Sequence, residues 1–136
     1  MPYARVNELH HHVGESVTVR GWVTTTRSSG KIAFVVLRDG SGYLQAVFSK
    51  RDVPEATWAR VAGLTLETSV AVTGVVRADA RATGGHELTA TDLEILGASP
   101  DFPISPKEHG STFLFEHRHL WLRSRRQVAI AKVRNE

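Results

Sequence analysis

The sequence predicts a mostly β protein, a five-stranded barrel with one helix, followed by a proline-rich connector and the start of a C-terminal helix. Three observations support this prediction. Apolar residues alternate with a period of two in five separate segments, which indicates strands. Turn residues such as Ser28-Ser29-Gly30 separate neighbouring segments. One stretch with helical spacing interrupts the strand pattern between the third and fourth segments.

The second and third segments, residues 31–38 and 43–48, alternate most clearly. One set of side chains faces the predicted core: Ala33, Val35, Leu37, Leu44, Ala46 and Phe48. The other set then places Phe34 and Gln45 on the outer face of neighbouring strands, and a one-residue slip in register would reverse the two faces. The turn at residues 38–42 joins the two strands into a hairpin.

The remaining elements complete the barrel. We expect strand one over residues 16–26, strand four over 68–78 and strand five over 86–96, with a short helix over 5–13 ahead of them. Gly21 marks a bulge or sharp coil in strand one, and Trp22 lies outside the barrel or in a seam. Residues 51–62 form a helix with Asp52 as its cap and Pro54 in its first turn. The order β-β-β-α-β-β matches the OB-fold, a partly open Greek-key barrel.

Composition limits the class of protein. The chain has 136 residues, 41% hydrophobic and 23% charged, without a run of about 20 apolar residues that could cross a bilayer. It has no cysteine, which excludes disulfides and thiolate metal sites and fits a cytoplasmic location. The net charge of +3 favours a polyanionic partner, and six of the 17 Lys and Arg residues lie from Arg118 onwards.

Three side chains on the predicted outer face form the candidate site. Phe34 offers an aromatic ring, Arg27 a cation and Gln45 an amide on a rigid sheet. Such groups can stack on, neutralise and hydrogen-bond an unpaired base. Each residue also has a plainer interpretation as an ordinary surface or core position. Catalytic constellations and metal sites are not expected, because the adjacent histidines at residues 10–12 point in different directions and the two glycines at residues 84–85 form a turn.

The chain changes character after Gly97. We expect an OB-fold domain over residues 1–97, a hinge over 98–116 that contains Pro100, Pro103 and Pro106, and a helix from residues 117–119 onwards. The helix pattern is still running at Glu136, without a cap, so we expect it to belong to a larger domain.

With these residues in hand, the sequence resembles class II aminoacyl-tRNA synthetases of the aspartyl/asparaginyl/lysyl subgroup. GWV at 21–23, KIAF at 31–34, LRDG at 37–40 and LQA at 44–46 are similar to their anticodon-binding barrel. The tail, FPISPKEHG followed by FLFEHRHLWLRSRRQ, resembles the hinge and first catalytic-domain helix of the asparaginyl enzymes. The similarity extends over essentially all 136 residues.

The resemblance implies specific roles for four residues. It implies that Phe34 stacks on an anticodon base, that Gln45 hydrogen-bonds the central uracil, that Arg27 contacts the same region, and that Glu87 lies near the anticodon pocket. It further implies a homodimeric parent enzyme that charges tRNA with asparagine using ATP and Mg²⁺, at a site outside this stretch.

Three alternatives stay open at this point. The chain could come from an aspartyl-tRNA synthetase, including one that does not discriminate between the two tRNAs. It could be a free-standing OB-fold protein that binds single-stranded nucleic acid. It could also be a protein-docking module that uses Trp121 and the basic helix. The sequence does not identify the reader of the third anticodon base.

Overall fold

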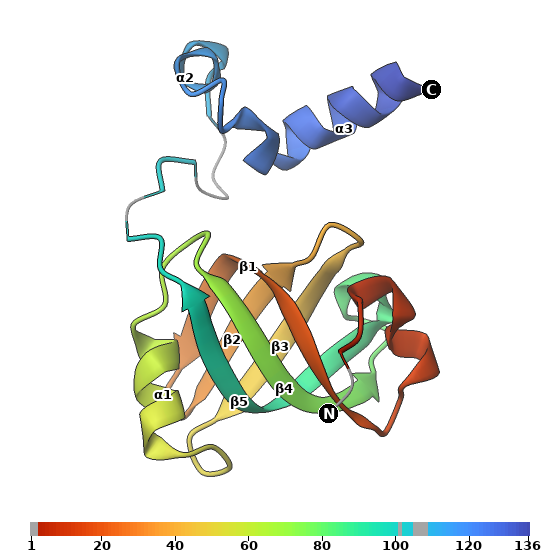
Figure 1. The fold of residues 1–136 in the computed structure, drawn as a ribbon, viewed down its shortest axis with the longest axis vertical. Helices are drawn as coiled ribbons and strands as arrows, with labels where there is room; N and C mark the ends of the chain where they lie inside the picture. The colour runs from red at the N-terminus through yellow and green to blue at the C-terminus, as the bar shows by residue number, and fades with distance from the viewer. Residues whose placement is uncertain (1–2, 101, 105–108) are drawn as a thin grey trace. The chain divides into compact units, whose positions relative to one another are not determined.

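The alternation of apolar residues closes the first part of the chain into a barrel (Figure 1). The computed structural model describes residues 3–100, 102–104 and 109–136, and the chain divides into two compact units, residues 1–100 and 101–136. The strands of the first unit hydrogen-bond in the order β1-β2-β3-β5-β4, and β4 pairs back onto β1. They are β1 (Ser16–Ser29), β2 (Ile32–Arg38), β3 (Tyr43–Ser49), β4 (Ser69–Ala78) and β5 (His86–Gly97). The predicted five-stranded OB-fold is confirmed.

The predicted inner face of the β2–β3 hairpin is confirmed. All six residues expected in the core are buried: Ala33, Val35, Leu37, Leu44, Ala46 and Phe48. They pack with Val17, Val19 and Val23 of β1 and with residues of β4 and β5 in one apolar cluster. The opposite face of the same hairpin therefore carries Phe34 and Gln45 outward.

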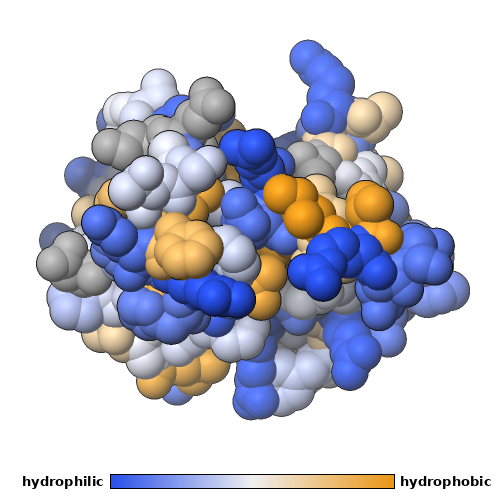
Figure 2. Space-filling model, turned by 90° about the horizontal axis from the view of Figure 1, so that it is seen from above, coloured by the Kyte–Doolittle hydropathy of each residue, from blue (hydrophilic) through white to orange (hydrophobic). Residues whose placement is uncertain are grey.

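The surface of the molecule is mixed in character. On the face shown in Figure 2, apolar side chains emerge in small groups among hydrophilic ones, as is normal for a protein surface. Trp22 belongs to the exposed apolar residues, with 39% of its surface accessible. It lies outside the barrel with the Arg38 guanidinium carbon 5.9 Å from its ring centroid. No helix in the described ranges is long and apolar enough to cross a membrane.

Of the two roles predicted for Gly21, a bulge or a sharp coil, the bulge is wrong. The irregularity in β1–β2 pairing falls between Val23 and Thr25, so the bulge lies beyond Gly21. Gly21 instead lies where two backbones approach closely. A Cβ added there would come within 2.5 Å of the Arg38 carbonyl oxygen. The glycine is needed for close approach, the other common reason for glycine inside a strand.

A 3-10 helix, η1 (Val6–His11), forms where a short helix over residues 5–13 was predicted. Its first backbone amides are satisfied by the β2–β3 turn. Val6 N–H donates to the Asp39 carboxylate at 2.8 Å, and Asn7 N–H donates to the Ser41 hydroxyl at 3.2 Å. These bonds anchor η1 at the end of the barrel opposite to α1 (Figure 1).

Helix α1 (Glu55–Ala62) is shorter at its start than the predicted 51–62. The expectation that Asp52 caps the helix is wrong. Pro54 occupies the cap position without a side-chain bond, and the Asp52 N–H donates to the Ser49 carbonyl in the preceding turn. Thr57 and Val61 bury the inner side of the helix, which fixes α1 against the barrel.

The second unit contains α2 (Ser111–Glu116), η3 (Trp121–Arg123) and α3 (Arg125–Asn135). The predicted C-terminal helix is present, but it begins at Arg125 instead of residues 117–119, because Ser124 adopts an extended conformation with ψ of 129° and separates η3 from α3. Helix α2 also falls inside the predicted hinge. Its Phe113 ring stacks on the His109 ring at 4.5 Å between centroids and makes a tilted contact with the His117 ring at 4.4 Å. Pro106 lies outside the described residues.

The contact between α1 and β5 gives a pH-dependent contribution to stability. The Thr57 hydroxyl donates to the Asp92 carboxylate at 2.7 Å, and Arg60 lies beside it at 3.3 Å. The hydrogen bond from Thr57, more than the charge of Arg60, lowers the pKa of Asp92 below its ordinary value of 3.8. A lowered folded-state pKa means that this stabilisation is present above 3.8 and is lost as the pH falls through the folded-state pKa.

We therefore predict that Asp92→Asn lowers the free energy of unfolding at neutral pH by up to about 1 kcal/mol, the range for an exposed ion pair. The difference from wild type should shrink as the pH falls below 3.8, the ordinary pKa of Asp92. Urea unfolding across this pH range measures it, with Glu94→Gln on the same strand as the control. A difference that stays constant with pH would contradict the assignment.

Candidate nucleic-acid interface

The outer face of the β2–β3 hairpin carries two of the four predicted site residues, Phe34 and Gln45. Phe34 pairs with Val47, and Val36 pairs with Gln45. Phe34 and Gln45 are thus diagonal neighbours on one face, at roughly 7–8 Å between Cα atoms for such positions. Strand β1 pairs with the edge of β2 that faces away from β3, and Arg27 of β1 lies directly opposite Phe34 in this pairing. The fold therefore brings Arg27, Phe34 and Gln45 onto a continuous surface.

Arg27 and Phe34 form a cation–π pair. The Arg27 guanidinium carbon lies 4.6 Å from the centroid of the Phe34 ring. Such contacts at exposed positions are worth roughly 0.5–1 kcal/mol, so the guanidinium can be displaced by a better partner. Arg27 is exposed and Phe34 half-buried. The pair presents an aromatic platform covered by a movable cation.

Glu87 joins the site through the closure of the barrel. β3 and β5 pair in parallel, and this register places Glu87 beside Gln45, although 42 residues separate them. The Gln45 amide Nε2 donates to the Glu87 carboxylate at 2.9 Å, and Arg77 of β4 donates to its other oxygen. Glu87 is only 5% exposed. This buried carboxylate is thus fully engaged by an amide and a guanidinium.

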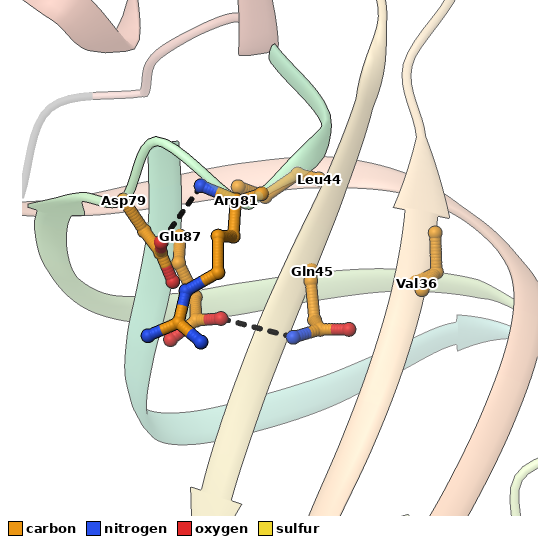
Figure 3. A pocket seen from close by; sticks show the side chains of 7 residues that line it. Val36, Leu44, Gln45, Asp79, Arg81 and Glu87 are labelled. Carbon is orange, nitrogen blue, oxygen red and sulfur yellow. Dashed lines mark hydrogen bonds between the residues drawn. The ribbon is translucent and has the colours of Figure 1, made fainter. Parts of the chain in front are cut away.

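The Glu87 carboxylate decides how the Gln45 amide points. An ionised carboxylate can only accept hydrogen bonds, so the amide must turn its NH₂ group towards Glu87. The Oε1 atom of Gln45 then points away, as Figure 3 shows. The amide consequently offers a ligand one acceptor, Oε1, and one donor, its second N–H. The relative position of this acceptor and this donor is fixed.

A pocket of about 290 Å³ opens above this amide. The β4–β5 loop forms its other wall, where the Asp79 carboxylate accepts the Arg81 backbone N–H at 3.0 Å. The side chains of Arg81, Glu87 and Gln45 converge on the same space (Figure 3). The residues lining it are Val36, Leu44, Gln45, Asp79, Arg81, Ala82 and Glu87. Polar and charged groups around a small apolar floor suit a planar, polar ligand.

The sequence reasoning missed Arg77, Asp79 and Arg81. Arg77 pairs directly with Glu87 across the β4–β5 hairpin, a neighbour that an antiparallel register between strands four and five would have identified. Asp79 and Arg81 belong to a polar loop whose conformation the residue types alone do not specify. In the described part of the chain, no group of three or more His, Asp or Glu side chains is placed to hold a metal ion.

A closed five-stranded barrel with an aromatic ring, an amide and cations on its β2–β3 face defines an OB-fold of the nucleic-acid-binding class. Comparison with known families agrees. Residues 17–96 match the profile of the OB-fold nucleic acid binding domain family that is named after the tRNA anticodon. The chain belongs to this family.

Its relatives are asparagine–tRNA ligases. All 136 residues align with the enzyme of Roseiflexus sp. strain RS-1 at 50% identity and with that of Symbiobacterium thermophilum at 48%. The chain spans 31% of the length of each. Among solved structures, the asparaginyl-tRNA synthetase of Pyrococcus horikoshii complexed with asparaginyl-adenylate matches at a TM-score of 0.81 and 38% identity, over 92% of this chain and 29% of that one.

We predict that Glu87→Ala lowers the free energy of unfolding by about 1.5–3 kcal/mol, because hydrogen bonds to a buried charge are lost on both sides. Denaturant unfolding measures this loss. Glu94→Ala, an exposed carboxylate on the same strand, is the control and should change stability by less than about 0.5 kcal/mol. Equal effects of the two substitutions would show that the Gln45–Glu87–Arg77 contacts contribute nothing.

Proposed function

We propose that this chain is the anticodon-binding part of an asparagine–tRNA ligase, and that its barrel binds the anticodon loop of the tRNA. The observation that carries the proposal is the Gln45–Glu87 contact beside Phe34, on the face that OB-folds use for oligonucleotides. The identity of 50% over 136 residues to a ligase of this specificity supports the choice of amino acid.

In this proposal each site residue has a distinct task. An anticodon base stacks on Phe34, and Arg27 leaves the ring to contact the RNA. Gln45 hydrogen-bonds the central uracil, while Glu87 acts as a positioning residue for the amide. Base–aromatic stacking contributes about 1–3 kcal/mol, more than the cation–π contact that it replaces. Binding therefore favours displacement of Arg27 from the ring.

The fixed amide explains a preference for uracil. Uracil presents the N3–H donor beside the O4 acceptor, whereas cytosine presents the N4–H₂ donor beside the N3 acceptor. A freely rotating amide could match either base by turning over. With Nε2 held by Glu87 at 2.9 Å, the amide matches one order of donor and acceptor only, which is the basis of hydrogen-bond specificity for a splayed base.

The remaining functions of the ligase belong to the part outside these residues. We propose that the complete enzyme is a cytoplasmic homodimer that activates asparagine with ATP and Mg²⁺ and transfers it to tRNA. In this proposal the anticodon-binding domain comprises residues 1–97 and the hinge residues 98–116. The first helix of the catalytic domain then corresponds to residues 117–136.

Binding of anticodon stem-loops tests the proposal directly. The 136-residue chain should prefer a GUU stem-loop and reject one with a changed central base, at fixed moderate salt. Phe34→Ala should weaken GUU binding by about 1–3 kcal/mol, or roughly 5- to 150-fold. If the chain binds GUU and GUC stem-loops equally but rejects the stem-loop with a changed central base, the third anticodon base is read outside this barrel or not at all. Absence of any discrimination would leave a generic single-strand binder, and absence of binding would refute the proposal.

Two single variants, Glu87→Gln and Gln45→Ala, together test the role of Glu87. An amide at position 87 can donate as well as accept, so Gln45 is free to turn over. We predict that Glu87→Gln narrows the preference for uracil over cytosine at the central position and keeps most of the affinity for the GUU stem-loop. Gln45→Ala should abolish the preference, worth about 1–3 kcal/mol for a good pair of hydrogen bonds. A uniform loss for all stem-loops in both variants would contradict a positioning role.

A further inference from the structure

The loop between α1 and β4 contains a strained residue. Among the residues that the structure describes, Glu67 is the one residue other than glycine with a positive φ, at 65°. This left-handed conformation brings Cβ close to the following carbonyl oxygen, so residues other than glycine, asparagine and aspartate seldom adopt it. Strained residues persist where their surroundings hold them, and they are common in segments that switch between conformations. Glu67 therefore requires strong partners in the folded protein.

Strands β1 and β2 supply these partners. The two terminal nitrogens of the Arg38 guanidinium, at the end of β2, donate to the two carboxylate oxygens of Glu67 at 2.8 and 2.6 Å. A bidentate pair of this kind is among the stronger hydrogen-bonded contacts in proteins, and only 13% and 11% of the Arg38 and Glu67 side chains are exposed. On β1, the Val23 carbonyl accepts the Glu67 N–H at 2.7 Å, and the Val23 N–H donates to the Thr68 carbonyl at 3.0 Å. The ion pair and β1 together hold Glu67 in its strained conformation.

The two threonines on either side of Glu67 bind the chain beyond β5. The Thr65 hydroxyl donates to the Ser99 carbonyl at 2.6 Å, and the Ser99 N–H donates to the Thr68 hydroxyl oxygen at 3.4 Å. The two hydroxyl oxygens lie 3.0 Å apart. Each hydroxyl has one hydrogen, and because Thr65 uses its own on Ser99, Thr68 donates to Thr65. One arrangement of hydrogens thus satisfies all three contacts and engages both backbone groups of Ser99.

We infer that residues 65–68 form a clasp on the connector, and that the left-handed conformation of Glu67 controls whether this clasp is closed. A turn of Glu67 into the ordinary region of negative φ would redirect the chain between Thr65 and Thr68, so their hydroxyls would no longer meet at Ser99. The Arg38 ion pair keeps the clasp closed. The barrel unit then ends at Ser99, two residues beyond the end of β5 at Gly97. This inference does not depend on RNA binding.

Two substitutions at one position separate the strain from the ion pair. Glu67→Ala and Glu67→Gly both remove the carboxylate that Arg38 binds, but glycine adopts a positive φ readily and alanine does not. We expect Glu67→Ala to open the clasp and Glu67→Gly to leave it closed. The readout is the NMR order parameter of the Ser99 amide in the 136-residue chain. It should be about 0.85 in the wild type and in Glu67→Gly, and below about 0.6 in Glu67→Ala.

Thr65→Val tests the clasp without changing Glu67. Valine keeps the shape of threonine but lacks the hydroxyl that donates to Ser99, so the Ser99 order parameter should fall below about 0.6. Thr26→Val, at an exposed threonine of β1, is the matched control and should leave Ser99 unchanged. The order parameter of Val35, which is fully buried, should stay at about 0.85 in every variant if the barrel remains folded.

An ordered Ser99 in Thr65→Val would overturn the clasp, as would a mobile Ser99 in the wild type. Equal order parameters for Ser99 in Glu67→Ala and Glu67→Gly would overturn the role of the strained conformation. The Thr65→Val measurement stays decisive for the clasp if the Glu67 variants lose the folded barrel.

Discussion

The parallel pairing of β3 with β5 is the constraint on which the site depends. Strands three and five are distant in sequence, and their pairing at Gln45–Glu87, Ala46–Leu88 and Val47–Thr89 converts an open sheet into a barrel. One face of this seam buries Ala46 and Leu88 completely. The other face brings the Gln45 amide onto the Glu87 carboxylate. Because side chains alternate along a strand, burial of the first pair fixes the second. The apolar core thereby sets the position of the polar contact.

Closure in turn requires residues without side chains where strands cross. Gly74 lies at the irregularity in β4–β5 pairing, and a Cβ there would come within 2.4 Å of the Thr89 carbonyl oxygen. Gly21 plays the same part between β1 and β2. Small barrels close by sharp coiling of their strands, so these two glycines permit a curvature that larger residues would oppose. Thr89 adjoins the β3–β5 seam, which links the curvature to the geometry of the site.

Sequence alone predicted the barrel and its outward residues because a period of two is a local property that burial enforces. The outward orientation of Phe34 and Gln45 followed from the core-facing residues on either side of each. The contact of Glu87 with Gln45 could not follow, because it depends on a parallel pairing between distant strands. The break at Ser124 was missed because residues 119–135 contain no glycine or proline, although Ser124 is of a type that favours the extended N-cap position, which it takes at the start of α3. Asp52 suited a helix cap by type, but the helix begins only at Glu55, with Pro54 at the cap position.

The barrel divides rigid from adjustable parts in a way that suits recognition of an unpaired base. The group that discriminates between bases in the proposed function is fixed: Glu87 is buried, and its bond to Gln45 removes the rotational freedom of the amide. In the same proposal Arg27, an exposed cation over the Phe34 ring, needs only to attract the RNA. Donors and acceptors that are already fixed lose little entropy on binding. They also cannot turn to suit an incorrect base, so that base leaves a polar group without a hydrogen-bond partner. Under the proposed function, specificity therefore arises at the seam of the barrel, where Gln45 and Glu87 meet.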